Sequence, residues 1–411
     1  MTLKNFDQKL TQYANLLVNV GVHVQKHQKI LLSIAVDQQL LAHKLVDAAY
    51  AAGADKVVIK WQDNYVLKQF LNSTTDEMLT KIPSYIKDEA DTLMNEHYSR
   101  ITILSEAPDS LSGVDAKRLA KYQQALSTAQ QAITEATINN RISWLVAGAA
   151  NRVWAKELFP DESEEEAYDH LWEAIFTTSR ITDDPIKTWQ AHIDELSKRA
   201  DWLNSLHLDK LHYQAKTADI TIGLAKDHIW EAAGSTDTQG NYFVPNIPTE
   251  EVFTAPNLHD INGEITSTKP LSYQGNVLTK IHLVFKDGQI IDASAEQGND
   301  VLQELIKTDA GSRSLGEVAL VPYDSPISNS EIIFQNTLYD ENASNHLAIG
   351  AGYPFNVKNG TELSKEKLHQ LGVNDSQVHV DFMVGSADMN IDGITQDGSI
   401  IPIFRNGNWA E

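Results

Sequence analysis

The stretch Lys29–Trp61, KILLSIAVDQQLLAHKLVDAAYAAGADKVVIKW, shows how the first half of the chain is built. It begins with the nearly continuous apolar run Lys29–Val36, continues with helical periodicity over Gln38–Ala52, and ends with a second apolar run, Lys56–Trp61. A short run that is apolar on both faces is typical of a strand buried on both sides. The stretch therefore predicts strand, helix and strand, the unit of a parallel sheet.

The same alternation continues on both sides of this stretch. A helical stripe that starts at Leu10 stops at Gly21, and strand-like runs begin at Arg100 (RITILSEA) and Arg141 (RISWLVAGAA). Long helical segments follow over 155–206, and the acidic run DESEEE (161–166) suits the N-terminus of one of them. We expect an α/β N-terminal domain with a mainly parallel sheet.

The pattern of apolar and polar residues changes near residue 208. Beyond it, short strand-like pieces alternate with turns, and VFKDGQIID reads as a hairpin around Asp287-Gly288. The sequence thus predicts an N-terminal α/β domain over 1–208 and an α+β domain over 209–411, a division that the size of the chain favours.

Composition excludes several classes of function. The 411 residues contain 33 Lys+Arg against 56 Asp+Glu, a net charge of −23, with no basic cluster, so we expect neither nucleic acid nor an anionic membrane as a partner. The chain has no cysteine, which excludes disulfides, thiolate nucleophiles and cysteine-bound metals. The polar start MTLKNFDQKL is unlike a signal peptide, and no apolar run has the ~20 residues of a membrane span, so a cytoplasmic location is expected.

Several familiar motifs fail. GSRSLGE has phosphate-loop spacing but carries Glu317 where lysine is required, and GAGYPF lacks the third glycine of a dinucleotide loop. DMNIDG begins like a calcium loop, yet Ser399 stands where the bidentate glutamate belongs, and an ordinary turn is favoured.

What remains is a set of carboxylates and imidazoles beside apolar strand sequence in the second half. In VHVDFMVG, alternation puts His379 and Asp381 on one face of a strand. Such groups are costly to bury unless they are paired or bind a metal. The other candidates lie in NIPTEEVFTAP, in GEVAL and in YDENASNHLAIGAGYPF: Glu251, Glu317, Glu341, His346 and Tyr353. Four carboxylates could neutralise two divalent ions, and mixed oxygen and nitrogen donors favour zinc, cobalt or manganese, with magnesium possible.

The blocks NIPTEEVFTAPN, DENASNHLAIGAGYPF, HVDFMVGS and DGITQDG resemble those of the thermophilic-type metallo-aminopeptidases, the group of aminopeptidase T, aminopeptidase S and PepS. The resemblance runs over the whole chain. It implies a homodimer whose N-terminal domain serves dimerisation and substrate access, a two-metal centre in the C-terminal domain, and removal of N-terminal amino acids from peptides. The ligands that it implies are Glu251, Glu317, His346, His379 and Asp381. Glu341 and Tyr353 match motif positions as ligand or catalyst, and Glu250 leaves open which of two adjacent carboxylates points inward.

The mechanism expected from this resemblance is peptide hydrolysis by metal-activated water. Glu317 or Glu341 would accept the proton, Tyr353 would bind the oxyanion, and Glu341 or Glu250 would pair with the substrate ammonium. A two-metal phosphoesterase is the alternative enzyme, although Arg313 and Arg405 are the nearest cations in sequence. The non-enzymatic alternative is a protein that binds peptides or metal without catalysis.

Overall fold

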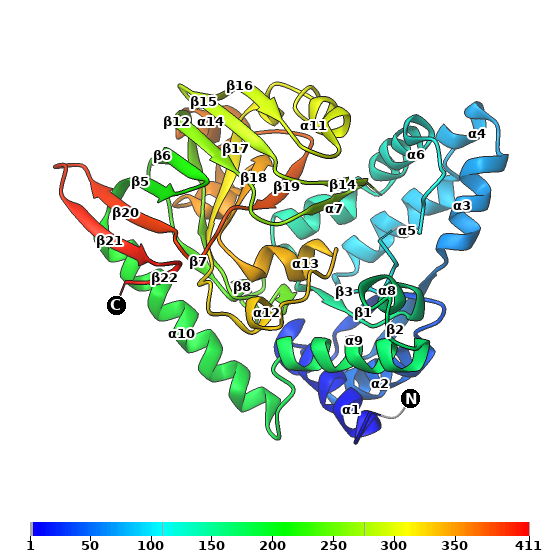
Figure 1. Ribbon diagram of the computed structural model, residues 1–411. Coiled ribbons are helices and arrows are strands. Elements are labelled where there is room, and N and C mark those ends of the chain that lie inside the picture. The colour runs from blue at the N-terminus through cyan, green and yellow to red at the C-terminus, as the bar shows by residue number, and fades with distance from the viewer. Residues whose placement is uncertain (1–2, 109, 275, 411) are drawn as a thin grey trace. The chain divides into compact units, whose positions relative to one another are not determined.

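The structure is a computed structural model that describes residues 3–108, 110–274 and 276–410. The chain folds into two compact units: Met1–Gln190 with Gly234–Pro248, and Ala191–Ala233 with Thr249–Glu411. It is a mixed α/β protein with one parallel sheet and several antiparallel sheets (Figure 1). Within the described residues, no helix has the length and apolar character needed to cross a membrane.

The first unit is built on a five-stranded parallel sheet with the order β10-β4-β3-β1-β2. The strand–helix–strand prediction for Lys29–Trp61 is confirmed, because β1 and β2 are parallel and α2 lies between them in the sequence. The strands are β1 Lys29–Ala35, β2 Lys56–Gln62, β3 Tyr98–Leu104, β4 Trp144–Gly148 and β10 Asn246–Ile247.

Helices cover this sheet. Leu31 of β1 packs with Ala90 of α5 and Ile133 of α7, so these two helices bury one of its faces. The expected helix start after Pro160 is confirmed, since Ser163 caps α9 and Glu166 completes a capping box. The helices are α1 Phe6–Leu16, η1 Leu17–Gly21, α2 Gln39–Ala51, α3 Asn64–Ser73, α4 Asp76–Thr80, α5 Ser84–Asn95, α6 Ala116–Ala129, α7 Gln131–Ile138, α8 Arg152–Leu158 and α9 Glu164–Thr178.

Helix α10 (Pro185–Leu206) ends directly before β5, where the sequence changes texture. The second unit contains an eight-stranded sheet with the order β16-β15-β12-β6-β5-β20-β21-β22. The predicted hairpin around Asp287-Gly288 is confirmed as β15–β16. The strands are β5 Leu208–Ala215, β6 Ala218–Leu224, β12 Pro256–Thr266, β15 His282–Lys286, β16 Gln289–Ser294, β20 Asn390–Thr395, β21 Ile400–Arg405 and β22 Asn408–Trp409.

A second, five-stranded antiparallel sheet with the order β19-β18-β17-β11-β7 carries the candidate site. Its strands are β7 Glu231–Ala232, β11 Val252–Thr254, β17 Leu315–Leu320, β18 His346–Gly350 and β19 His379–Met383. Every residue of β17 and β18 is buried, so polar side chains on these strands face the interior of the unit.

Short elements complete the fold. The segment DMNIDG is only partly the predicted turn: Asp388 accepts a hydrogen bond from Ser386, and β20 already begins at Asn390. The remaining elements are β8 Ser235–Thr236, β9 Tyr242–Phe243, β13 Leu271–Tyr273, β14 Asn276–Leu278, α11 Asn299–Leu305, η2 Gly311–Arg313, α12 Pro326–Asn329, α13 Thr337–Asp340, η3 Glu341–Ala343, η4 Pro354–Asn356, η5 Gly360–Glu362 and α14 Lys365–Gln370.

Candidate metal centre

The face of β19 is as the alternation predicts. Nε2 of His379 lies 3.4 Å from Oδ1 of Asp381, whereas Val380 between them faces the other way. Asp381 stands opposite Ala348 on β18, which in turn stands opposite Glu317 on β17. His346 precedes Ala348 by two residues and so lies on the same face of β18. Because paired residues of adjacent strands share a face, three strands present polar side chains to one region.

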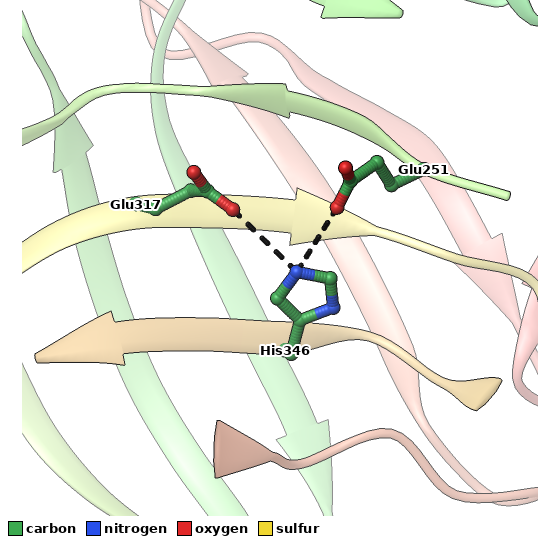
Figure 2. Close-up of side chains that lie close together, drawn as sticks. All are labelled: Glu251, Glu317 and His346. Carbon is green, nitrogen blue, oxygen red and sulfur yellow. Dashed lines mark ion pairs between the residues drawn. The ribbon is translucent and has the colours of Figure 1, made fainter. Parts of the chain in front are cut away.

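One group of possible ligand atoms comprises Glu251, Glu317 and His346, with its atoms within 4.8 Å of one another. Figure 2 shows both carboxylates pointing toward one nitrogen of the imidazole. Nε2 of His346 lies 3.1 Å from Oε2 of Glu251 and 3.5 Å from Oε1 of Glu317. Two carboxylates and an imidazole at this spacing can hold a divalent cation.

The second group comprises Glu317, His379 and Asp381. Oε2 of Glu317 lies 3.8 Å from Nε2 of His379, while its other oxygen faces His346. Glu317 therefore belongs to both groups, one oxygen to each. A carboxylate shared in this way is the arrangement expected between two neighbouring ions.

A β-bulge aims Glu317 at this position. The pairing of β17 with β18 shifts register between Leu315 and Glu317, so Gly316 is the extra residue. A Cβ at Gly316 would lie 2.1 Å from the carbonyl oxygen of Ala351. Glycine is therefore required for the close approach of these two backbone segments.

The same backbone fixes the two imidazoles. Nδ1 of His379 lies 2.7 Å from the Ala351 carbonyl oxygen, and Nδ1 of His346 lies 3.2 Å from that of Ser344. Because a carbonyl oxygen only accepts hydrogen bonds, each Nδ1 is the protonated nitrogen and donates. Each Nε2 then faces the carboxylates, the orientation of a metal-ligating histidine, and a bound cation would take the place of its proton.

The charges in the site perturb one another. Burial would lower the pKa of His346, but Glu251 and Glu317 raise it well above its usual value. The pKa of His379 is likewise raised to about 10, against the effect of burial, chiefly by Asp381. Burial raises the pKa of Glu317. Among the described residues, the carboxylates of the two groups form ion pairs only with imidazoles, which favours the binding of a further positive charge.

Glu341 and Tyr353 lie beside the two groups but belong to neither. Burial raises the pKa of Glu341 well above its usual value, and the carboxylates of Asp381 and Glu251 add to this. The ring of Tyr353 lies 4.9 Å from that of His379 and stacks on Phe355 at 5.0 Å. Both side chains thus lie close to residues of the two groups.

Glu250 belongs to neither group of possible ligand atoms, and its role in holding a substrate ammonium stays a prediction. Its Oε2 lies 3.7 Å from Nε2 of His192 on α10, and Asn342 accepts a hydrogen bond from its backbone N–H. Glu251 is the carboxylate of this pair that contacts His346.

Sequence reasoning missed Glu231. It stands on β7 opposite Phe253, which stands opposite Ala319, which stands opposite His346. Glu231 therefore shares the face of the proposed ligands, about three strand spacings or ~14 Å from His346 along the sheet. Burial raises its pKa to about 7. A strand of two residues is too short to show a periodic pattern. The one signal in the sequence that could have indicated Glu231 is an acidic residue within the segment WEAAG.

Comparison with known proteins agrees with the motif blocks. The model of the family described as thermophilic metalloprotease (M29) matches residues 6–409. Aminopeptidase PepS of Streptococcus thermophilus is 47% identical over 412 residues and covers 100% of both chains, and aminopeptidase AmpS of Bacillus subtilis is 47% identical over 409 residues, 99% of this chain and 100% of that one. Aminopeptidase T of Thermus aquaticus is 34% identical over 406 residues, 98% of this chain and 99% of that one.

A solved structure is similar along the whole chain. Wild-type AmpT from Thermus thermophilus matches with a TM-score of 0.93 at 33% identity, covering 99% of this chain and 100% of that one. Sequence identity and fold thus agree over the same full length. The resemblance inferred from the motif blocks is confirmed, and the chain belongs to the thermophilic metalloprotease family M29.

Proposed function

We propose that this chain is a metal-dependent aminopeptidase that releases N-terminal amino acids from peptides at a centre of two divalent ions. The observation that carries the proposal is the position of Glu317, whose two oxygens face two different histidines in two overlapping groups. The relatives that match over the full chain bear aminopeptidase names, which supports the same reaction class. The proposed ligands are Glu251, Glu317, His346, His379 and Asp381.

The donor set fits such ions. Oδ1 of Asp381 is buried and, although His379 is 3.4 Å away, forms no hydrogen bond within the described part of the chain. A buried carboxylate oxygen without a partner is costly, and a cation would satisfy it. Mixed oxygen and imidazole donors suit zinc, cobalt or manganese, and magnesium less well.

When bound, the ions would increase the acidity of a water molecule and polarise the scissile carbonyl. The chain's own residues then move protons and hold charge. Both oxygens of Glu317 face histidines, so Glu341 is the carboxylate proposed as the general base. Glu341 would accept a proton from the water molecule while the water oxygen forms a bond to the carbonyl carbon. Glu341 would return that proton to the leaving amine as the C–N bond breaks.

Tyr353 is proposed to donate a hydrogen bond to the oxyanion of the tetrahedral intermediate. Its ring is fixed between His379 at 4.9 Å and Phe355 at 5.0 Å, so its hydroxyl does not have to be ordered during the reaction. Phe253 lies 6.3 Å from the Tyr353 ring and 6.2 Å from the Phe355 ring. These three aromatic residues would provide an apolar surface for the substrate's side chain.

The structure disfavours the phosphoesterase alternative. Arg313 donates to the Ile290 carbonyl oxygen, and Arg405 pairs with Asp392. Both guanidinium groups are engaged in the fold, whereas a phosphoryl group needs cations at the reacting centre.

The test compares hydrolysis of leucine amide, of leucyl-glycine, of N-acetyl-leucyl-glycine and of a phosphate monoester, each with and without added metal. We expect turnover of the first two only, and only with metal, because acetylation removes the ammonium charge and adds bulk at the free terminus. Equal rates for the acetylated peptide would refute exopeptidase activity. Turnover of the phosphate ester alone would favour the phosphoesterase, and binding without turnover would favour the non-catalytic protein.

Three further properties remain part of the proposal. The family resemblance supports a homodimer in which residues 1–208 serve dimerisation and substrate access while residues 209–411 carry catalysis. All five proposed ligands lie in the second unit. The absence of cysteine fits a reducing cytoplasmic location.

A further inference from the structure

The parallel sheet of the first unit contains a point where the chain reverses its direction across the sheet. From β1 the chain moves to β2 on one side, and then returns to β3 on the other side of β1 before continuing to β4. Right-handed crossovers in opposite directions send the connections to opposite faces of the sheet. The carboxyl ends of β1 and β3 are therefore left with a crevice between their connections, where open α/β sheets bind ligands.

A cavity of about 420 Å³ opens at this place. It is lined by the end of β1 (Ala35–Asp37), the junction of β2 with α3 (Gln62–Tyr65), the segment after β3 (Ser105–Ala107), and Asn151 and Val153 after β4. Four consecutive strands of the sheet thus contribute to it. Its volume lies within the range of sites for small molecules.

The cavity contains a buried polar group without a partner. Ser105 is 1% exposed, and within the described residues its hydroxyl forms no hydrogen bond. Buried hydroxyls are normally satisfied, so Ser105 is an unsatisfied position in the wall of the cavity, with its hydroxyl behind the cavity surface.

Two carboxylates line this cavity. Asp37 follows the end of β1 and Glu106 follows the end of β3, and these two strands are neighbours in the sheet. One oxygen of Asp37 accepts a hydrogen bond from Asn151, and one oxygen of Glu106 accepts from the Ser105 backbone N–H. One oxygen of each carboxylate is thus held in place by the protein.

The remaining lining defines the ligand class. Asp63 adds a third carboxylate, and three carboxylates would repel a phosphate group. The sequence after β1 also lacks the glycine-rich loop that binds phosphate in other parallel sheets. The carboxylates suit an ammonium group, and Lys68 of α3 suits a carboxylate. Val36, Ala107 and Val153 provide an apolar wall.

We propose that this cavity is a second binding site, separate from the metal centre, for a small zwitterion of the class of free α-amino acids and dipeptides. The ammonium group of such a molecule would contact Asp37 and Glu106, and its carboxylate would contact Lys68. Its side chain would contact the apolar wall. Binding at this site can be tested independently of peptide hydrolysis, because the amino acid is added directly to the protein.

The experiment measures leucine binding to the full-length, metal-loaded protein by calorimetry, and localises it by hydrogen exchange with mass spectrometry. Two analogues, isocaproate without the ammonium and isoamylamine without the carboxylate, test each charge. The variants are Asp37→Asn combined with Glu106→Gln, and Lys68→Met. Matched controls are the exposed Asp47→Asn and Lys26→Met, which do not line the cavity.

We expect leucine to protect amides in residues 62–68 and 105–108, and the cavity variants, but not the controls, to bind at least about tenfold more weakly, the effect of one lost charge-assisted hydrogen bond. Protection confined to the second unit, or affinity unchanged in both cavity variants, would overturn the proposal. So would protection of residues 62–66 and 151–153 that depends on protein concentration and not on leucine, since a second copy would then cover the cavity.

Discussion

Glu250 and Glu251 are adjacent in the sequence, yet their carboxylates lie in different environments. Oε2 of Glu251 is 3.1 Å from Nε2 of His346 in the candidate metal centre, whereas Oε2 of Glu250 is 3.7 Å from Nε2 of His192 on α10. Both are buried, so burial alone does not separate a ligand from a structural residue. The partner of each carboxylate does.

Glu251→Gln should weaken metal binding by more than the ~10–100-fold that loss of an outer-shell partner costs, because it removes a charged ligand. Glu250→Gln is the matched control and should keep the metal. Elemental analysis after dialysis against dilute metal measures both. Equal metal loss in the two variants would contradict the assignment of the inward carboxylate.

Chelation should abolish peptide hydrolysis, and added cobalt, zinc or manganese should restore it, because the ions supply the acidity that activates water. Far-UV circular dichroism should change little, since each unit retains its own apolar core. Full activity in a sample that elemental analysis shows to be free of metal would rule out a metal-dependent reaction.

Gly316→Ala should reduce activity by lowering metal content, although residue 316 is not itself a ligand. The added Cβ would lie 2.1 Å from the Ala351 carbonyl oxygen, which holds Nδ1 of His379 at 2.7 Å. Displacing that carbonyl misorients the imidazole. Metal titration with a chromophoric competitor measures the effect, and an unchanged affinity would show that the bulge does not position the ligands.

Tyr353→Phe should lower kcat by roughly 10²–10³, as expected for one lost oxyanion donor, with metal content unchanged. Phe355→Leu removes the stacking partner but keeps the hydroxyl, so its effect should be much smaller. If the Tyr353→Phe protein loses its metal instead, Tyr353 is a ligand and its role as a hydrogen-bond donor is wrong.

Glu231→Gln should change the pH dependence of stability. Burial raises the pKa of Glu231 to about 7 from an ordinary value of 4.5, so the folded state favours the neutral acid. Its contribution is fully present below pH ~4.5 and is lost as pH rises through ~7. The variant lacks this loss. Relative to wild type it should gain on the order of 1 kcal/mol between pH 5 and pH 8, after allowance for solvent screening of a half-buried group. Urea unfolding at both pH values measures it, and parallel curves would contradict the assignment.

The sequence by itself determined the elements and the chemistry available to them. In Lys29–Trp61 the apolar runs and the helical repeat predicted a parallel unit, because strands covered on both faces read as nearly continuous apolar runs. β1 is buried as this predicts, whereas β2 lies at the edge of the sheet and has no fully buried residue. In β19 the period of two placed His379 and Asp381 on one face. Both conclusions depend only on residues that are near in the sequence, and the structure agrees with each.

Only the tertiary structure decided which side chains meet. The bulge at Gly316 gives Glu317 one oxygen for each histidine, and strand order brings Glu231 onto the same face. The crevice beside Asp37 likewise exists because β3 lies next to β1 and not next to β2. Side-chain periodicity fixes a face within one strand, whereas contacts across strands depend on order and register, which long-range packing sets.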